Sequence, residues 1–363
     1  MFNFLPVDMN ERARRSIVWW LVITCFLIAA MVVVGGATRL TDSGLSITEW
    51  KPVTGIVPPL SDSDWAAEFT KYQTIPEYEL VNKDMSLEAF KSIYWWEWGH
   101  RFLGRIIGFV FFLPLVYFLV TRQVARGLAP KLIIMLILGG AQGALGWFMV
   151  QSGLSDRVDV SQYRLAAHLG AAFLIYAYIL WIAMDLVLNG EGGMLPTRQK
   201  AWTQLYTGGL MVTGLIYLQI VLGGFVAGLH AGHAYNTWPL MDSGFVPGGY
   251  FFLSPWPRNF FENIATVQFN HRMVGYVIAV VMAALLMMIR HVSIPVHCRR
   301  ALHVLVGVTL AQIALGIWTL LAVVPLALGL AHQAGALAAF TASLVFVQLV
   351  RHETCGVRDS SAL

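Results

Sequence analysis

Residues 97–109 (EWGHRFLGRIIGF) place a carboxylate, a histidine and two arginines at the start of a long apolar run. Such groups are costly beside hydrocarbon, so in a membrane-spanning segment they indicate a ligand or a specific structural partner. Glu97 lies three residues before His100, which puts both side chains on one face of a helix. A carboxylate there could act as a general base, move protons or stabilise a developing positive charge. The alternative is an acid that only stabilises a helix N-terminus.

Histidines recur at related positions along the chain. His100 and His168 lie in the first half, and His271 and His332 lie in the second. Each falls within the first turns of an apolar run. A lone histidine in such a run is usually a hydrogen-bonded packing residue, but four at related positions favour ligands.

A small residue follows each histidine at i+4, on the same helix face; these are Gly104, Ala172, Gly275 and Ala336. A small residue there clears a flat surface for a large planar group. A metal ion alone would not need that clearance, and no nearby Cys, Asp or Glu completes a closed zinc site. We therefore predict haem, held by an axial histidine from each of two helices. Ordinary packing of small residues between helices is the alternative.

Arginines accompany the histidines. Arg101 and Arg272 follow directly, and Arg105, Arg164 and Arg39 are expected near the same surface. Haem propionates are carboxylates, which the guanidinium fork binds well, so these arginines are propionate candidates. Snorkelling of long side chains to the membrane interface remains the other explanation.

The elements that position these residues are membrane-spanning helices. The 363 residues are 57% hydrophobic and only 12% charged, about half the charged fraction of a soluble domain. Eight apolar runs long enough to cross a bilayer are expected, at 17–36, 97–120, 131–150, 164–188, 203–226, 268–290, 300–323 and 328–350. Cys25, Cys298 and Cys355 are scattered and indicate neither a disulfide framework nor a thiolate metal site. We predict an all-α integral membrane protein.

Basic residues predict the orientation. They gather before the first span, between the second and third, before the fifth and seventh, and after the eighth. The positive-inside rule makes these segments cytoplasmic, so both termini are expected inside and the histidines toward the outer face of the cell (inner) membrane. Attraction to anionic lipid accounts for the net charge of +4 without any nucleic acid.

An internal repeat predicts the domain organisation. EWGHRFLGRIIGFV at 97–110 matches QFNHRMVGYVIAVV at 268–281, and AQGALGW at 141–147 matches AQIALGIW at 311–318. The chain reads as two repeat-related four-helix bundles whose pseudo-twofold axis follows the membrane normal. The expected divisions are a cytoplasmic N-terminus (1–16), an N-terminal half (17–190), a cytoplasmic linker (191–202), a C-terminal half (203–350) and a cytoplasmic tail (351–363).

The two long outer segments, 37–96 and 227–267, are expected to be lids or binding elements, with passive connectors as the alternative. The first contains amphipathic pieces that could lie on the membrane surface.

These motifs together resemble the haem A synthase family. The similarity runs from about residue 17 to 350 and includes EWGHR, the second NHR, GGATRLTDSGLSITEWKPVTGIVPPL and LHAGHAYNTWPLMD. The resemblance implies oxidation of the C8 methyl of haem O to a formyl group through hydroxymethyl and gem-diol stages. It also implies a haem b cofactor on His271 and His332, with substrate haem O near His100 and His168. The resemblance also suggests a haem O synthase and an electron carrier of unknown identity as partners. Some members carry a cysteine pair in the first outer loop, which this chain lacks.

The two halves differ at one informative position, because Glu97 corresponds to Gln268. An amide cannot replace the acid–base chemistry of a carboxylate, so Glu97 is the predicted catalytic residue. The main alternative function is a di-haem cytochrome b that relays electrons from quinol. A haem exporter is disfavoured because all four histidines are expected at one side. The sequence leaves open the oligomeric state and the source of the inserted oxygen.

Overall fold

The computed structural model describes residues 9–51, 54–154, 157–188, 199–290 and 292–355. Within them the chain is helical and contains no strand. The elements are α1 (Glu11–Leu40), η1 (Thr54–Ile56), α2 (Asp62–Tyr72), α3 (Pro76–Leu80), α4 (Leu87–Val120), α5 (Ala129–Gln151), α6 (Gln162–Leu188), α7 (Gln199–Gly228), η2 (Ala231–His233), η3 (Trp256–Arg258), α8 (Asn259–Glu262), α9 (Ile264–Ile289), α10 (Val296–Leu321) and α11 (Leu326–Cys355). Parts of the predicted N-terminal segment (1–8), linker (191–198) and tail (356–363) lie outside the described residues.

Eight of these helices are long and apolar enough to cross a membrane, which confirms the predicted number of spans. They are α1, α4, α5, α6, α7, α9, α10 and α11. Helix α4 begins at Leu87, well before the predicted start of its span, and the Ser86 hydroxyl caps it by accepting from Ala89 N–H. Its 34 residues extend roughly 50 Å, more than the hydrocarbon thickness, so its first turns project beyond the membrane.

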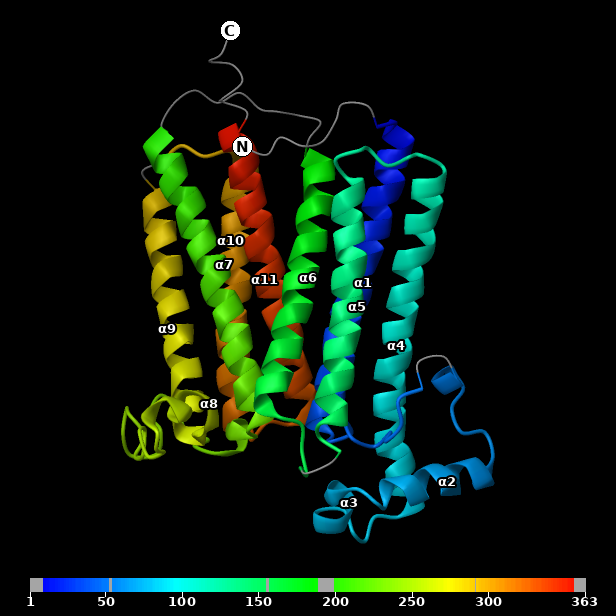
Figure 1. Cartoon of the computed structure of the whole chain (residues 1–363). Coiled ribbons are helices and arrows are strands. Elements are labelled where there is room, and N and C mark those ends of the chain that lie inside the picture. The colour runs from blue at the N-terminus through cyan, green and yellow to red at the C-terminus, as the bar shows by residue number, and fades with distance from the viewer. Residues whose placement is uncertain (1–8, 52–53, 155–156, 189–198, 291, 356–363) are drawn as a thin grey trace.

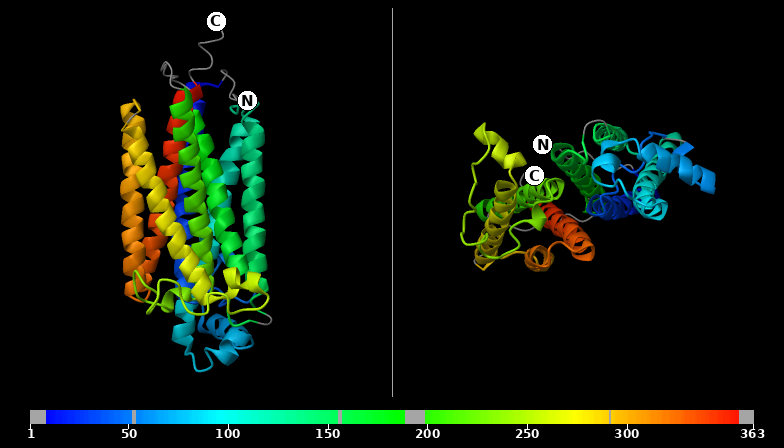
Figure 2. Two further views of the ribbon diagram at one scale, coloured as in Figure 1. Left: turned by 90° about the vertical axis from the view of Figure 1, so that its left-hand side faces the viewer. Right: turned by 90° about the horizontal axis from the view of Figure 1, so that it is seen from below.

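The eight long helices form two groups side by side (Figures 1 and 2). Helices α1, α4, α5 and α6 make the N-terminal half, and α7, α9, α10 and α11 make the C-terminal half. Contacts of α6 with α7, and of α1 and α6 with α11, join the halves. Helices α2, α3 and α8 lie at one end of the array, which we call the cap end; α1 begins and α11 ends at the opposite end (Figure 1).

Packing within each half follows the same order. Helix α4 packs mainly on α1 and α5 mainly on α6, while α4 and α5 contact each other little. In the C-terminal half, α9 packs on α7 and α10 on α11, while α9 and α10 contact each other little. Each half is therefore closed along three sides and loosely packed between its second and third long helices.

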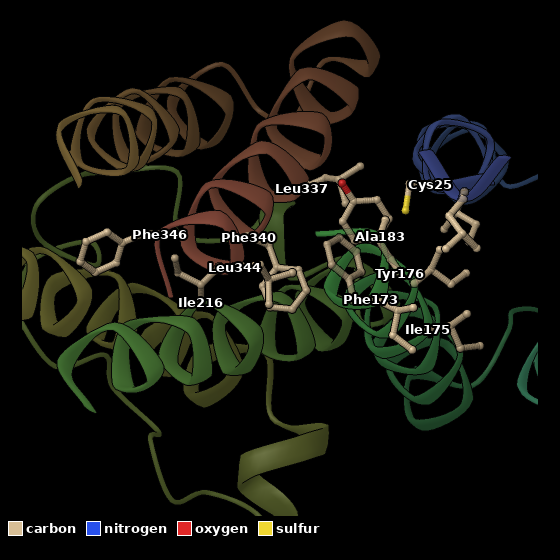
Figure 3. Close-up of a cluster of buried hydrophobic side chains, with 14 of the residues drawn as sticks. Cys25, Phe173, Ile175, Tyr176, Ala183, Ile216, Leu337, Phe340, Leu344 and Phe346 are labelled. Atoms are coloured by element: carbon tan, nitrogen blue, oxygen red, sulfur yellow. The ribbon is translucent and has the colours of Figure 1, made fainter. Parts of the chain in front are cut away.

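The apolar core lies away from the cap end. Its buried residues on α4, α9 and α11 all follow the histidine of their helix, toward the opposite end. Figure 3 shows part of it at the seam between the halves, where Phe173 and Tyr176 of α6 lie near Phe340 of α11. The Tyr176 hydroxyl lies 2.8 Å from the Thr341 hydroxyl. The two halves are therefore packed together by buried side chains on the side of the histidines away from the cap end.

The first long connection folds into a cap on α4. A capping box between Ser61 and Asp64 starts α2. Trp65 and Tyr72 of α2 are buried against the first turns of α4, where the Tyr72 and Phe90 rings lie 5.2 Å apart. Helix α2 thus turns Trp65 and Tyr72 toward α4, because the early start of α4 supplies an apolar surface there.

Candidate functional site

The four predicted ligand histidines lie on the second and fourth long helices of each half. His100 is on α4 and His168 on α6, while His271 is on α9 and His332 on α11. The members of each pair are near enough to interact electrostatically. All four keep part of their surface accessible although they lie between helices. The fold thus brings together the two pairs that the sequence predicts.

Each imidazole lies against a glycine of a neighbouring helix. A Cβ added at the glycine would come within 2.6–3.3 Å of the ring; the pairs are Gly35 with His100, Gly146 with His168, Gly223 with His271 and Gly316 with His332. Real Cβ contacts below 3.0 Å essentially do not occur, so Gly146 and Gly316 tolerate no side chain unless the ring moves. Each ring therefore occupies space that a side chain at the neighbouring glycine would need.

Three glutamines hold the main chain beside the histidines. Gln142 Nε2 donates to the His168 carbonyl oxygen at 2.9 Å, Gln219 Nε2 to that of His271 at 2.9 Å, and Gln312 Nε2 to that of His332 at 2.7 Å. Each glutamine lies four residues before the glycine under the same ring. The Gln-x-x-x-Gly spacing, which occurs in all three helices, is the sequence signal that identifies these glutamines.

The residues present fit a haem held by two histidines. The Nδ1 atoms of His168 and His271 are buried and have no hydrogen-bond partner within the described chain. At Gly104 a Cβ would meet only the Met31 methyl at 3.3 Å, and at Gly275 only Gln219 Nε2 at 3.7 Å. Within the same residues no three His, Cys, Asp or Glu side chains group as a metal site. This donor set suits a haem iron better than an ion that needs three or four protein ligands.

Glu97 is buried and both of its oxygens accept hydrogen bonds. Oε2 accepts from the Ser46 hydroxyl and from Ile47 N–H, both at 2.7 Å, and Oε1 accepts from Arg101 Nε at 3.1 Å and Nη2 at 2.6 Å. Arg101 also donates to the carbonyls of Ile47 and Glu49. Glu97 and Arg101 thus fasten the segment after α1 onto α4. For Glu97 to accept a proton, one of these bonds has to break.

Gln268 and Arg272 fasten the corresponding segment of the C-terminal half. Gln268 Nε2 donates to the Ala231 and Ala234 carbonyls at 2.7 and 2.5 Å, and its Oε1 accepts from Arg272. Arg272 also donates to the carbonyls of Tyr235, Thr237 and Leu240. The difference between Glu97 and Gln268 matches their hydrogen-bond partners. The segment after α1 offers donors to the carboxylate, whereas the segment after α7 offers carbonyl acceptors to the amide. Arg272 Nε is buried without a partner among the described residues, which leaves it one donor for an anion.

The other arginines have protein partners at the cap end. Arg105 Nη2 donates to the Lys51 carbonyl at 2.9 Å, and the Arg164 guanidinium lies 4.5 Å from the Phe148 ring centroid. Arg39 of α1 forms a salt bridge with Asp159, with 3.0 Å between Nη2 and Oδ2. The same Nη2 lies 2.6 Å from Nε2 of His230, two residues after the end of α7. Arg39 and His230 therefore link the two halves at this end.

A buried carboxyl in the cap makes stability depend on pH. Glu77 of α3 is 5% exposed, and its Oε2 has no partner within the described residues. Burial first, and then the negative charge of Glu97, raise the pKa of Glu77 from its usual 4.5 to about 8. The folded protein holds this proton between pH 4.5 and 8 and the unfolded chain does not, so the unfolding free energy falls as pH rises through that window.

Glu77→Gln keeps the site neutral at every pH. We expect the variant to melt on the order of 5 °C above the unmodified protein at pH 8.5 and equally at pH 5. Glu79→Gln on the exposed side of the same helix is the control and should change neither value. Thermal unfolding in detergent from pH 5 to 9 gives the measurement. Parallel pH profiles for the protein and Glu77→Gln would show that Glu77 is ionised throughout.

Known proteins match this chain along most of its length. Residues 18–344 match the family model described as cytochrome oxidase assembly protein. A protein of Parvibaculum lavamentivorans named Heme A synthase is 51% identical over 344 residues, which cover 93% of this chain and 96% of the relative. Proteins of the same name from Nitrosospira multiformis and Chelativorans sp. are 50% and 52% identical over 93% and 91% of this chain and 94% and 90% of their own lengths. The chain therefore belongs to the cytochrome oxidase assembly protein family that contains these haem A synthases.

Proposed function

We propose that this chain is a multi-pass membrane oxidoreductase of haem biosynthesis, a haem A synthase that oxidises the C8 methyl of haem O to a formyl group. The observation that carries the proposal is the two glycine-seated histidine pairs, found in a chain about half identical to haem A synthases over more than 90% of its length. Identity at this level along the whole chain favours the synthase over a di-haem relay cytochrome.

Each half holds one haem in this proposal. The C-terminal half binds the haem b cofactor through His271 and His332, and the N-terminal half binds substrate haem O through His100 and His168. The equivalent packing of the long helices and the equivalent seats of the histidines support two repeat-related bundles. Arg272 is a propionate candidate whose Nε donor is buried without a partner in the described structure. Arg101 would have to release part of its bonds to Glu97 and to the Ile47 and Glu49 carbonyls. Arg105 and Arg164 remain candidates because they lie on the same helices as His100 and His168.

The cap end faces the outer side of the cell membrane in this proposal. Basic residues lie at the opposite end, which the positive-inside rule makes cytoplasmic; those in the described residues include Arg12, Arg14, Arg15, Arg122 and Arg126. Both haem sites are then near the outer surface. Haem O dissolves in lipid, so delivery by a haem O synthase in the same membrane requires no aqueous transfer.

The residues of the N-terminal half have separate roles in the proposed reaction. His100 and His168 orient the substrate, and Gly104 and Ala172 leave its face uncovered. His271 and His332 would hold haem b in the other half, where it would supply a redox centre for the oxidation. Glu97 contributes the negative charge that Gln268 lacks, and it stabilises positive charge that develops at the oxidised carbon. Through its bonds to Ser46 and Ile47 it also keeps the outer segment closed over the site.

Mass spectrometry of pigment extracted from the purified protein tests the proposed activity. We expect haem B together with haem O, haem A or a hydroxylated intermediate. Cells that also express a haem O synthase should accumulate haem A only when this chain is present. Haem B alone, at two per chain and under the same co-expression, would instead identify a relay cytochrome.

A further inference from the structure

The main-chain oxygen of His100 lacks the glutamine that the other three histidines have. Gln142, Gln219 and Gln312 each lie one helical turn from the glycine under a ring and donate to that histidine's carbonyl oxygen. Around His100 the same place on α1 is taken by Met31, four residues before Gly35. No side chain in the described part of the structure donates to the His100 carbonyl.

Met31 and Gln219 occupy corresponding places in the two halves. The Met31 methyl is the nearest atom to the open side of Gly104 on α4, and Gln219 Nε2 is the nearest to Gly275 on α9. Both tips therefore lie one turn below the histidine, beside the small residue that leaves room for the haem face. Gln219 Nε2 is also 3.2 Å from Nε2 of His271. Because methionine stands where the C-terminal half has Gln219, α1 has no counterpart of the bond by which α7 holds the His271 carbonyl of α9.

Glutamine and methionine differ in how firmly they hold two neighbouring helices, and this difference affects how readily a bound haem exchanges. A glutamine held by a carbonyl fixes the relative position of two helices before any ligand binds, which lowers the cost of ordering the site. A methionine has three rotatable bonds and no strong donor, so it adapts to surfaces of different shape. A cofactor site gains from the first property. A site that must accept one haem and release a larger oxidised product gains from the second.

We propose that residue 31 makes the N-terminal haem site exchangeable, whereas Gln219 makes the C-terminal site retentive. Met31 gives the His100 main chain no donor from α1, so this histidine adjusts as substrate enters and product leaves. Helix α4 stays joined to α1 at other levels, where Trp20 donates to the Val110 carbonyl and Thr38 to the Trp96 carbonyl. Gln219 holds His271 and α9 against α7, so that haem b stays bound through many turnovers. This inference rests on the proposed assignment of one haem to each half.

Transfer of haem to apomyoglobin measures the exchange directly. The full-length protein is loaded with two protohaem molecules per chain and mixed with excess apomyoglobin. Two phases are expected, the faster one absent from His100→Ala and the slower one absent from His271→Ala. Met31→Gln should slow the faster phase about fivefold to tenfold, the effect of one hydrogen bond, and Gln219→Met should accelerate the slower phase by a similar factor.

In each variant, the transfer phase of the unchanged haem site serves as the control. Met31→Leu keeps the volume without a donor, so it should leave the slower phase unchanged and should slow the faster phase less than Met31→Gln does. An unaltered slower phase in Met31→Gln shows that the variant is folded, and an unaltered faster phase does so for Gln219→Met. If the phases follow the histidine variants but neither residue 31 nor residue 219 changes its own phase, the inference is wrong while the haem sites stand. If the phases do not follow the histidine variants, the haem assignment itself is wrong.

Discussion

Replacing both His271 and His332 with alanine should abolish the low-spin spectrum of the haem b that we propose for the C-terminal half. The double variant lacks both proposed axial ligands of the C-terminal site, together with the rings that lie against Gly223 and Gly316. Bound cofactor stabilises only the folded state, so the melting temperature should fall as well. Absorption and electron paramagnetic resonance spectra of the purified double variant, scaled to protein, give the measurement.

His233→Ala is the matched control for that double variant. His233 lies at the cap end, is exposed, and belongs to η2 rather than to a long helix. Its loss should leave the haem b spectrum and the melting temperature unchanged. A complete bis-histidine signal in the double variant would mean that the resident haem lies elsewhere, with the pair on α4 and α6 as the first place to look.

Changing Glu97 to Gln should leave a folded protein that keeps haem b but makes little haem A. Loss of a catalytic carboxylate typically lowers a rate by a factor of about 10² to 10⁴. The structure adds a second source of loss, since Oε2 of Glu97 accepts from Ser46 and Ile47 and one orientation of the amide would set a donor against them. Haem A formed per haem b in co-expressing cells is the measurement.

Ser46→Ala separates these two sources. It removes one bond of Glu97 to the outer segment and leaves the charge in place, and we expect a loss of less than about tenfold. Gln268→Glu is not an equivalent control, because a carboxylate cannot donate to the Ala231 and Ala234 carbonyls as the amide does. Equal activities of Glu97→Gln and Ser46→Ala would limit Glu97 to holding the segment. Near-normal haem A formation in Glu97→Gln would remove it from the mechanism altogether.

Much of the site could be predicted from the sequence because its signals are local and repeated. Apolar runs of sufficient length specify spans whatever their neighbours, and all eight were confirmed. A histidine and the small residue at i+4 share a helix face by geometry alone. Four such pairs at related positions therefore predict two sites for planar ligands, and this assignment stays a prediction.

The tertiary structure decided what each polar group contacts. Glu97 meets Ile47, 50 residues earlier, and Gln219 meets the carbonyl of His271, 52 residues later. Neither contact follows from helical periodicity, because each depends on which helices become neighbours and at what relative height. The Glu97 and Gln268 difference looked catalytic in the sequence, and the structure shows that it also matches donors in one segment to acceptors in the other. The spans and the candidate ligands thus follow from sequence alone. Which histidine carbonyls accept a glutamine bond depends on helix packing, because such a bond forms only where two helices bring donor and acceptor within reach.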